Sequence, residues 1–235
     1  MAPDELVVRV AGSHARVLEL AGRLDDRQRG EPSALPGWTR GHVLQHLVDN
    51  ARAFEAQALA ALRGELVDMY DGGQEGRDRS IDEGAARPVA ELREELKLAQ
   101  RALEEAWSGL TAADWQRTVR FRHATVLDTA LARWREAEIH AVDLAVGYRP
   151  RDWPRDFAVH ALDFLSARAP AGTRLRLRAT DDEFTQVLGT GTTVEVSGAL
   201  RDLAAWMSGR DTEGHLDTTG TDVPELGPWP PDPAD

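Results

Sequence analysis

The sequence predicts two domains: an all-α bundle of four helices over residues 1–150, and a small α+β domain over residues 151–235. Apolar residues recur with helical spacing across most of the first 147 positions. After Pro150 the pattern changes, because Thr173–Ala179 places an arginine at every second position, as a half-buried strand does. We therefore expect helices alone before Pro150, and strands mixed with helices after it.

The first domain is expected to contain four helices, over residues 4–28, 40–63, 80–109 and 125–147. Thr39 suits the N-cap of the second helix, and Gly64 suits its C-terminal end. Ser80–Glu83 forms a capping-box pattern at the start of the third helix, which Pro88 interrupts or kinks. The connection Glu65–Arg79 is long enough to cross the bundle, so the second and third helices can run in the same direction.

The second domain is expected to follow a linker at Trp153–Pro154. Its elements are predicted to be a helix, three strands and a second helix, over residues 156–167, 173–179, 183–188, 192–196 and 198–208. Gly189–Gly191 resembles the turn of a hairpin, so the second and third strands are expected to pair. The proline-rich tail Pro224–Asp235 is expected to be a surface strap or a disordered segment.

The composition is that of a globular protein without cysteine. The chain is 42% hydrophobic and 29% charged, which is enough to bury a sizeable core. Its net charge of −12 argues against binding to a nucleic-acid backbone. Neither a signal peptide nor a membrane span is visible, so we expect a cytoplasmic monomer. Without cysteine, a tight metal site must use histidine and carboxylates, and thiol chemistry must use an external thiol.

Two predicted helices carry polar residues on one face. His42, His46 and Asn50 recur every four residues along the second helix, so they share a face. Glu136 and His140 share a face of the fourth helix in the same way. Each pair alone is a weak signal, because such residues are common in helices that bind nothing.

Helical rise makes the combination stronger. His46 and His140 each lie ~10 Å from one end of their helix, so they fall at the same depth if the two helices are antiparallel. An up-down-down-up bundle gives that pairing. A His/Glu/His set with one open position suits a catalytic zinc ion. Either His42 or His46 fits by spacing; His46 is deeper and matches His140 better, so His42 is expected to line the entrance.

Taken together, these segments resemble a known family. The resemblance rests on P-G-W-T-x-G-H-V-x-x-H-x-x-x-N at residues 36–50 and W-R-E-x-x-x-H-x-x-D at residues 134–143. Both are similar to the mycothiol-dependent maleylpyruvate isomerases of the DinB-like metal-binding bundle superfamily, and the similarity spans nearly the whole chain. It implies a DinB-like bundle, a sterol-carrier-like second domain, and zinc held by His46, Glu136 and His140.

The resemblance also implies the chemistry. Mycothiol would occupy the open zinc position as a thiolate and add to the cis double bond of maleylpyruvate. Rotation about the new single bond and loss of the thiol would leave fumarylpyruvate, a step in the catabolism of aromatic compounds. An arginine of the second domain is expected to serve activity, and Arg210 matches it best. Such an arginine could hold a substrate carboxylate through two hydrogen bonds.

Other residues have two interpretations each. His42, Asn50 and Arg79 are expected to bind substrate or thiol, although Asn50 could instead bridge helices and Arg79, like Arg77, could be solvated. Asp143 is expected to orient a ligand histidine from behind, or else to face solvent. Two further sets are expected to have no chemical role. One strand surface facing solvent would carry Arg174, Arg176 and Arg178, and the core or a pocket wall would contain Trp38 and Trp134.

Two other functions fit the same residues. A mycothiol S-transferase would share both the metal and the thiol, so the motifs do not separate it from an isomerase. A non-catalytic metal-binding regulatory module would not need the open zinc position. The second domain with Arg210 favours the isomerase.

Overall fold

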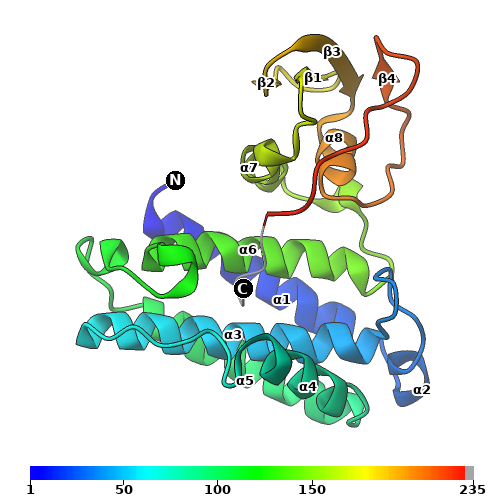
Figure 1. Ribbon diagram of the computed structural model, residues 1–235. Helices are drawn as coiled ribbons and strands as arrows, with labels where there is room; N and C mark the ends of the chain where they lie inside the picture. The colour runs from blue at the N-terminus through cyan, green and yellow to red at the C-terminus, as the bar shows by residue number, and fades with distance from the viewer. Residues whose placement is uncertain (231–235) are drawn as a thin grey trace. The chain divides into compact units, whose positions relative to one another are not determined.

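The computed structural model describes residues 1–230, and the chain falls into two compact units (Figure 1). The first unit comprises Met1–Tyr148 and the second begins at Arg149. Among residues 1–230, none of the helices has the length and apolar character needed to span a membrane. The part of the proline-rich tail beyond residue 230 lies outside the described residues.

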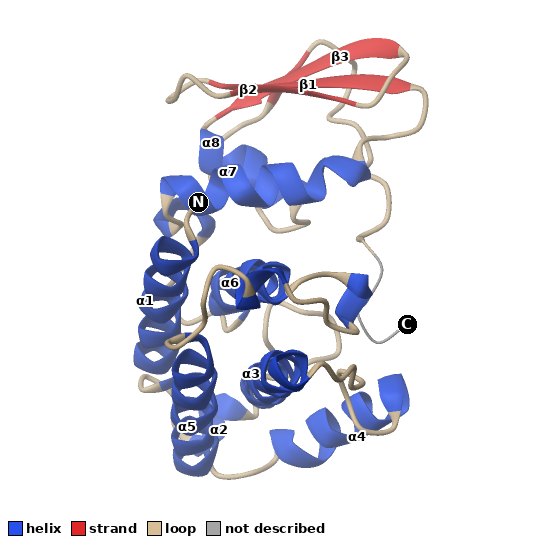
Figure 2. Ribbon diagram, turned by 90° about the vertical axis from the view of Figure 1, so that its left-hand side faces the viewer, coloured by secondary structure: helices blue, strands red, loops and turns tan. Residues whose placement is uncertain are grey.

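Four long helices build the first unit: α1 (Pro3–Ala21), α3 (Arg40–Arg63), α5 (Val89–Trp107) and α6 (Val126–Asp143). α3 packs against α5 and α6, and α1 packs against the same two helices. In Figure 1, α1 and α6 run in one direction and α3 and α5 in the other, and Figure 2 shows α3 and α6 close to end-on. This is the predicted up-down-down-up bundle.

The bundle core is apolar and is filled from all four helices. Fully buried side chains lie on the inner face of each helix: Leu6, Val10, Leu44, Leu47, Phe54, Leu92, Leu96 and Trp134. Burying a side chain of this size stabilises the fold by roughly 1.5–3 kcal/mol. Trp134 therefore belongs to the core, one of the two places expected for it.

The first helix is shorter than its apolar pattern predicts. α1 ends at Ala21, and a separate short helix, α2 (Asp26–Arg29), follows. The side chain of Asp25 accepts a hydrogen bond from the backbone N–H of Gln28, and the Gln28 side chain accepts one from the backbone N–H of Asp25, so the chain restarts at a capping box. α6 likewise stops at Asp143, short of Gly147.

The connection between α3 and α5 is not the long loop that the sequence predicts. Residues 73–79 of it join the start of the predicted third helix to form α4 (Gly73–Ala85), which packs against α3, so Ser80 lies inside a helix and does not cap one. Pro88 divides α4 from α5, as its position predicted. Gly72 and Gly73 both have positive φ, at 76° and 62°, and they make the turn that leads into this helix. The glycine content of the segment had predicted a loop here. Ser80 of α4 donates a hydrogen bond of 2.9 Å to Asp49 of α3, which fixes one helix on the other.

Two short 3-10 turns, Asp114–Gln116 and Phe121–His123, lead from α5 to α6. The second unit begins with a third, at Pro150–Asp152, and then contains a four-stranded mixed sheet and two helices. Its elements are α7 (Arg155–Phe164), a 3-10 turn (Leu165–Arg168), β1 (Thr173–Ala179), β2 (Thr185–Leu188), β3 (Thr192–Gly198), α8 (Leu200–Met207) and β4 (Asp217–Thr218). The strand order is β2-β1-β3-β4.

The predicted pairing of the second and third strands is wrong. β1 lies between them, antiparallel to β2 and parallel to β3. Gly189 and Gly191 do not close a hairpin; they let the chain cross the start of β1, because a Cβ at Gly191 would lie 1.9 Å from the carbonyl oxygen of Gly172. The alternation in β1 is as predicted: Leu175 and Leu177 are buried, while the arginines between them are exposed.

Candidate active site

The start of α3 fixes where its histidines point. Thr39 is the N-cap: its Oγ1 accepts from the backbone of His42, and the His42 ring nitrogen Nδ1 accepts from the backbone of Thr39 at 3.2 Å. The His42 Nε2 atom lies 3.6 Å from Asp82 of α4. His42 therefore serves the helix cap and faces α4, and its role at the entrance of a site stays a prediction.

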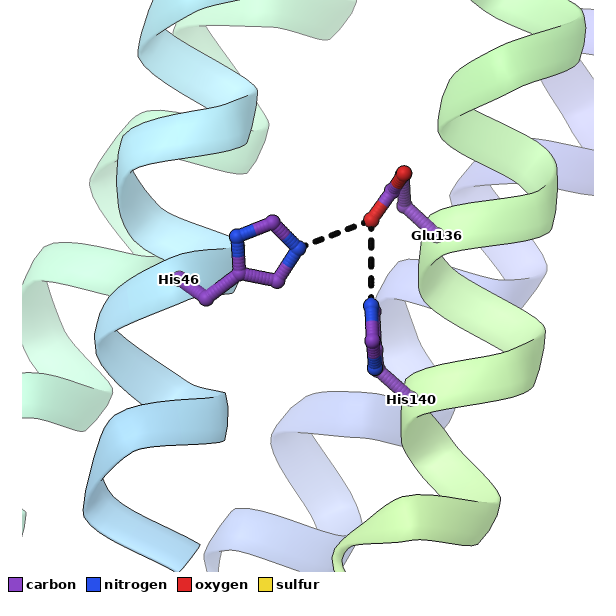
Figure 3. Close-up of side chains that lie close together, drawn as sticks. All are labelled: His46, Glu136 and His140. Atoms are coloured by element: carbon purple, nitrogen blue, oxygen red, sulfur yellow. Dashed lines mark hydrogen bonds and ion pairs between the residues drawn. The ribbon is translucent and has the colours of Figure 1, made fainter. Parts of the chain in front are cut away.

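His46, one turn further along α3, meets two residues of α6 (Figure 3). Its Nε2 lies 2.8 Å from Glu136 Oε2, and the Nε2 atom of His140 lies 3.2 Å from the same oxygen. One potential ligand atom from each residue lies within 4.8 Å of the others. We call these three residues the His–Glu cluster. It brings together the three side chains that helical depth predicted.

Asp143 supports this cluster from behind. Its Oδ2 lies 2.9 Å from His140 Nδ1, and its side chain is buried. A carboxylate on the far nitrogen holds an imidazole in one orientation and makes its other nitrogen a better metal ligand. Of the two interpretations offered by the sequence, the geometry favours the orienting one.

The charges of the cluster are strongly coupled. Burial lowers the pKa of His46 to about 4, even though its contact with Glu136 acts in the opposite direction. Burial would also raise the pKa of Glu136, but hydrogen bonds from both histidines outweigh it and hold that pKa well below its usual value. For His140, burial is outweighed by Asp143 and Glu136, so its pKa rises to about 9. A neutral imidazole and a carboxylate are the forms that bind metal.

α4 places Arg77 beside the cluster. From the sequence, this residue was expected on a loop and its role was left open. Arg77 Nη2 lies 3.5 Å from His46 Nδ1, and its guanidinium lies over the rings of Trp38 (5.9 Å) and Tyr70 (5.8 Å). Arg79, two residues along, is exposed, and its role in binding stays a prediction. The sequence signal for α4 was weak, because few of its residues are buried.

A second set of polar residues crosses the bundle core, and we call it the Arg133 network. Arg133 of α6 is fully buried. Its Nε donates to His14 Nε2 of α1 (2.9 Å), and its Nη1 donates to Asn50 Oδ1 of α3 (2.9 Å). His14 Nδ1 in turn lies 2.7 Å from Glu104 of α5. One residue from each long helix thus takes part, and Asn50 does bridge helices.

Tyr70 is a buried side chain that packs against Arg77. Its ring lies under the guanidinium of Arg77, at 5.8 Å, and Arg77 also contacts His46. Burial raises the pKa of Tyr70 to about 12, so it carries its proton at neutral pH. No sequence pattern selects Tyr70, because a single tyrosine between helices has no periodic partner.

Arg210 lies in the second unit, just after α8. Its Nη1 donates to the carbonyl of Ser208 at 2.6 Å, and its guanidinium lies 5.5 Å from the centre of the Trp229 ring. Arg168 lies over the same ring at 5.4 Å. Trp229 belongs to the proline-rich tail, so the described part of the tail contacts this unit. The part of Arg210 in catalysis stays a prediction.

Comparison with known proteins agrees with these features. The family model described as mycothiol maleylpyruvate isomerase N-terminal domain matches residues 10–145, and the one described as MDMPI C-terminal domain matches residues 152–228. No curated protein sequence matches the chain.

Two solved structures are similar over 97% of this chain and 98% of their own, each with a TM-score of 0.87 and 26% identity. One is the crystal structure of the mycothiol-dependent maleylpyruvate isomerase, and the other is a histidine-to-alanine mutant of that isomerase. The chain therefore belongs to the mycothiol maleylpyruvate isomerase family and is an enzyme of that family.

Proposed function

We propose that this enzyme converts maleylpyruvate to fumarylpyruvate and that it depends on zinc and mycothiol. The observation that supports the proposal is the convergence of His46, Glu136 and His140 in a chain that resembles the crystallised isomerase over nearly its full length. The isomerase in that structure is described as mycothiol-dependent.

The His–Glu cluster fits zinc by its donor set. Two imidazoles and one carboxylate are ligands that zinc accepts, and three protein ligands leave a fourth position open. Asp143 would hold His140 in place for the ion. When bound, the ion and mycothiol would supply a thiolate that adds to the cis double bond and leaves after rotation about the resulting single bond.

The side chains around the cluster would stabilise the negative charge of a bound thiolate or substrate carboxylate. Arg77 places a guanidinium beside His46, where it can offset the charge of a thiolate or a substrate carboxylate. His42 and Arg79 are proposed to contact thiol or substrate nearer the surface. For Arg210 we propose a hydrogen-bonded grip on a carboxylate of the substrate, which its fork of N–H donors suits.

The test is the ultraviolet absorbance of maleylpyruvate after adding zinc-loaded enzyme, with and without mycothiol. Conversion to fumarylpyruvate that requires the thiol supports the proposal. An inert sample with a full equivalent of zinc contradicts it, and formation of a mycothiol conjugate from an electrophile would then identify an S-transferase. An Arg210→Ala variant with unchanged zinc content and unchanged turnover would remove that residue from the site.

A further inference from the structure

The two histidines of the His–Glu cluster have groups of opposite kind behind them. His140 Nδ1 faces the buried carboxylate of Asp143 at 2.9 Å, which is a hydrogen-bond acceptor. His46 Nδ1 instead faces Arg77 Nη2 at 3.5 Å, and a guanidinium has only donors. A histidine that binds metal usually donates its second ring N–H to an acceptor. The neighbour of His46 therefore does not suit a metal ligand.

Several contacts hold Arg77 in this position. Its side chain is 12% exposed, and its guanidinium lies 5.9 Å from the centre of the Trp38 ring and 5.8 Å from that of Tyr70. Its Nη1 donates to Asp78 Oδ1 at 3.0 Å. Asp78 is 54% exposed, so water screens this ion pair and the carboxylate offsets the charge of Arg77 only in part. The positive charge of Arg77 is therefore fixed next to His46.

The hydrogen bond from Arg77 suits His46 only while its Nε2 atom binds no metal. Because Nδ1 accepts from Arg77, the ring is neutral and its single proton is on Nε2, which lies 2.8 Å from Glu136 Oε2 (Figure 3). A metal ion on Nε2 takes the place of that proton, and the neutral ring then carries its proton on Nδ1. Two donors, Nδ1–H and the guanidinium, would then face each other. Arg77 thus favours the metal-free form of His46.

We propose that Arg77 weakens metal binding by the His–Glu cluster and makes the site selective for an anionic fourth ligand. This inference rests on the metal site of the proposed function. One imidazole ring separates the guanidinium from the metal position, so its charge repels the ion and attracts an anion bound to that ion. The same charge therefore lowers the affinity for metal and raises the affinity for a thiolate or a carboxylate at the fourth position.

The first test measures the affinity for zinc by competition with a chelator. Arg77→Met removes the charge and the donors but keeps a long side chain, so it should bind zinc about tenfold more tightly than the wild type. Arg77→Lys keeps the charge and should stay within about threefold of the wild type. The matched control is Arg52→Met, at an exposed residue of α3 that pairs with Glu95 at 3.1 Å, and its zinc affinity should be unchanged.

The second test measures the binding of two anions, mycothiol and maleate, to the zinc-loaded proteins by calorimetry. Arg77→Met should bind at least one of them about tenfold more weakly than the wild type and the Arg52→Met control. A weakening with mycothiol alone identifies the thiolate as the anion that Arg77 attracts, and a weakening with maleate alone identifies a carboxylate. A damaged site would lose affinity for metal and anion together, so shifts in opposite directions support the inference.

The inference and the proposed function fail in different ways. If Arg77→Met binds zinc no more tightly than the wild type, or binds both anions equally well, the inference is overturned even when the wild type isomerises maleylpyruvate. If the zinc-loaded wild type does not isomerise maleylpyruvate but Arg77→Met shows the two opposite shifts, only the proposed function fails. A wild type that binds no zinc would overturn both.

Discussion

The four-helix bundle holds two polar clusters that are built in different ways. The His–Glu cluster draws on α3 and α6, and its ionisable groups contact one another directly, with Glu136 27% exposed. The Arg133 network draws on all four long helices, and Arg133 is completely buried. Its contacts are an imidazole, an amide oxygen and the carbonyl of Leu47, so no carboxylate touches it among the described residues.

The comparison separates groups arranged for a ligand from groups arranged for the fold. In the His–Glu cluster two ring nitrogens converge on one carboxylate oxygen, an arrangement that can take an ion between them. In the Arg133 network a single guanidinium donates to three acceptors on two other helices. Removing it would leave these buried acceptors without a hydrogen-bond donor. We therefore expect the first cluster to control metal and activity, and the second to control stability.

The largest expected effect tests whether the His–Glu cluster controls metal binding and activity. Glu136→Gln keeps the shape of the side chain but removes the central charge, so it should lose the metal and lower isomerase activity by more than about 1000-fold. Metal analysis and the maleylpyruvate assay measure both. Glu104→Gln, in the Arg133 network, is the matched control and should keep its metal. A Glu136→Gln protein with a full equivalent of zinc would contradict the assignment.

The second largest expected effect tests whether the Arg133 network controls stability. Arg133→Met leaves His14, Asn50 and the carbonyl of Leu47 without their donor, so the free energy of unfolding should fall by about 3 kcal/mol. Urea denaturation of the metal-free protein measures it. Arg101→Met, at an exposed position of α5, should change stability by less than about 0.5 kcal/mol. Equal stability of the two variants would show that the network is not structural.

A pH titration sharpens the contrast further. Burial lowers the pKa of His14 to about 4 from 6.5, despite the opposing contact with Glu104; Arg133 also lowers it. Below pH 6.5 the unfolded chain therefore binds more protons than the folded one, and stability is lost as the pH falls to about 4. His14→Gln should remove about 2 kcal/mol of the loss between pH 7 and pH 4.5. His123→Gln, at an exposed position, should show the same pH slope as the wild type; a His14→Gln slope like the wild type would refute the prediction.

The smallest expected effect concerns the support of the His–Glu cluster. Asp143→Asn should weaken zinc binding about tenfold, because His140 loses the charge behind it but keeps a hydrogen-bond partner. Competition with a chelator measures the affinity. Asp49→Asn, which alters the contact between α3 and α4 outside the cluster, should leave the affinity unchanged. If both variants bind zinc as the wild type does, Asp143 plays no part in holding the ion.

The sequence was informative where a pattern is local. Spacing of four residues and depth in the helix favoured His46 over His42 as the partner of Glu136 and His140, because a regular helix converts sequence position into depth. The depth of His140 was counted from Gly147, whereas α6 ends at Asp143. Metal binding by these residues stays a prediction. The alternation of Thr173–Ala179 identified β1 for the same reason, since a strand has a fixed period.

Contacts between distant segments were not accessible in this way. Nothing near His14 or Arg133 in the sequence indicates that they meet, because their pairing depends on which helices become neighbours. The order of the strands was missed since a short loop such as Gly189–Gly191 fixes the length of a connection but not the partner of the strand that follows. The first half of α4, before Ser80, was missed because its glycines outweighed a small apolar face.

The position of Arg77 has a consequence for engineering. It is carried by α4, which is packed on the outside of α3 and joined to it by contacts such as Ser80 with Asp49. Most of the side chains that fill the bundle core and all three of the His–Glu cluster lie on other helices, while α4 contributes Ile81 and Ala85 to the core. If the proposed function holds, the exposed positions of segment 73–85 can be varied as a unit, with Ile81, Ala85 and the contacts to α3 retained, to change substrate preference while the scaffold and the His–Glu cluster stay the same.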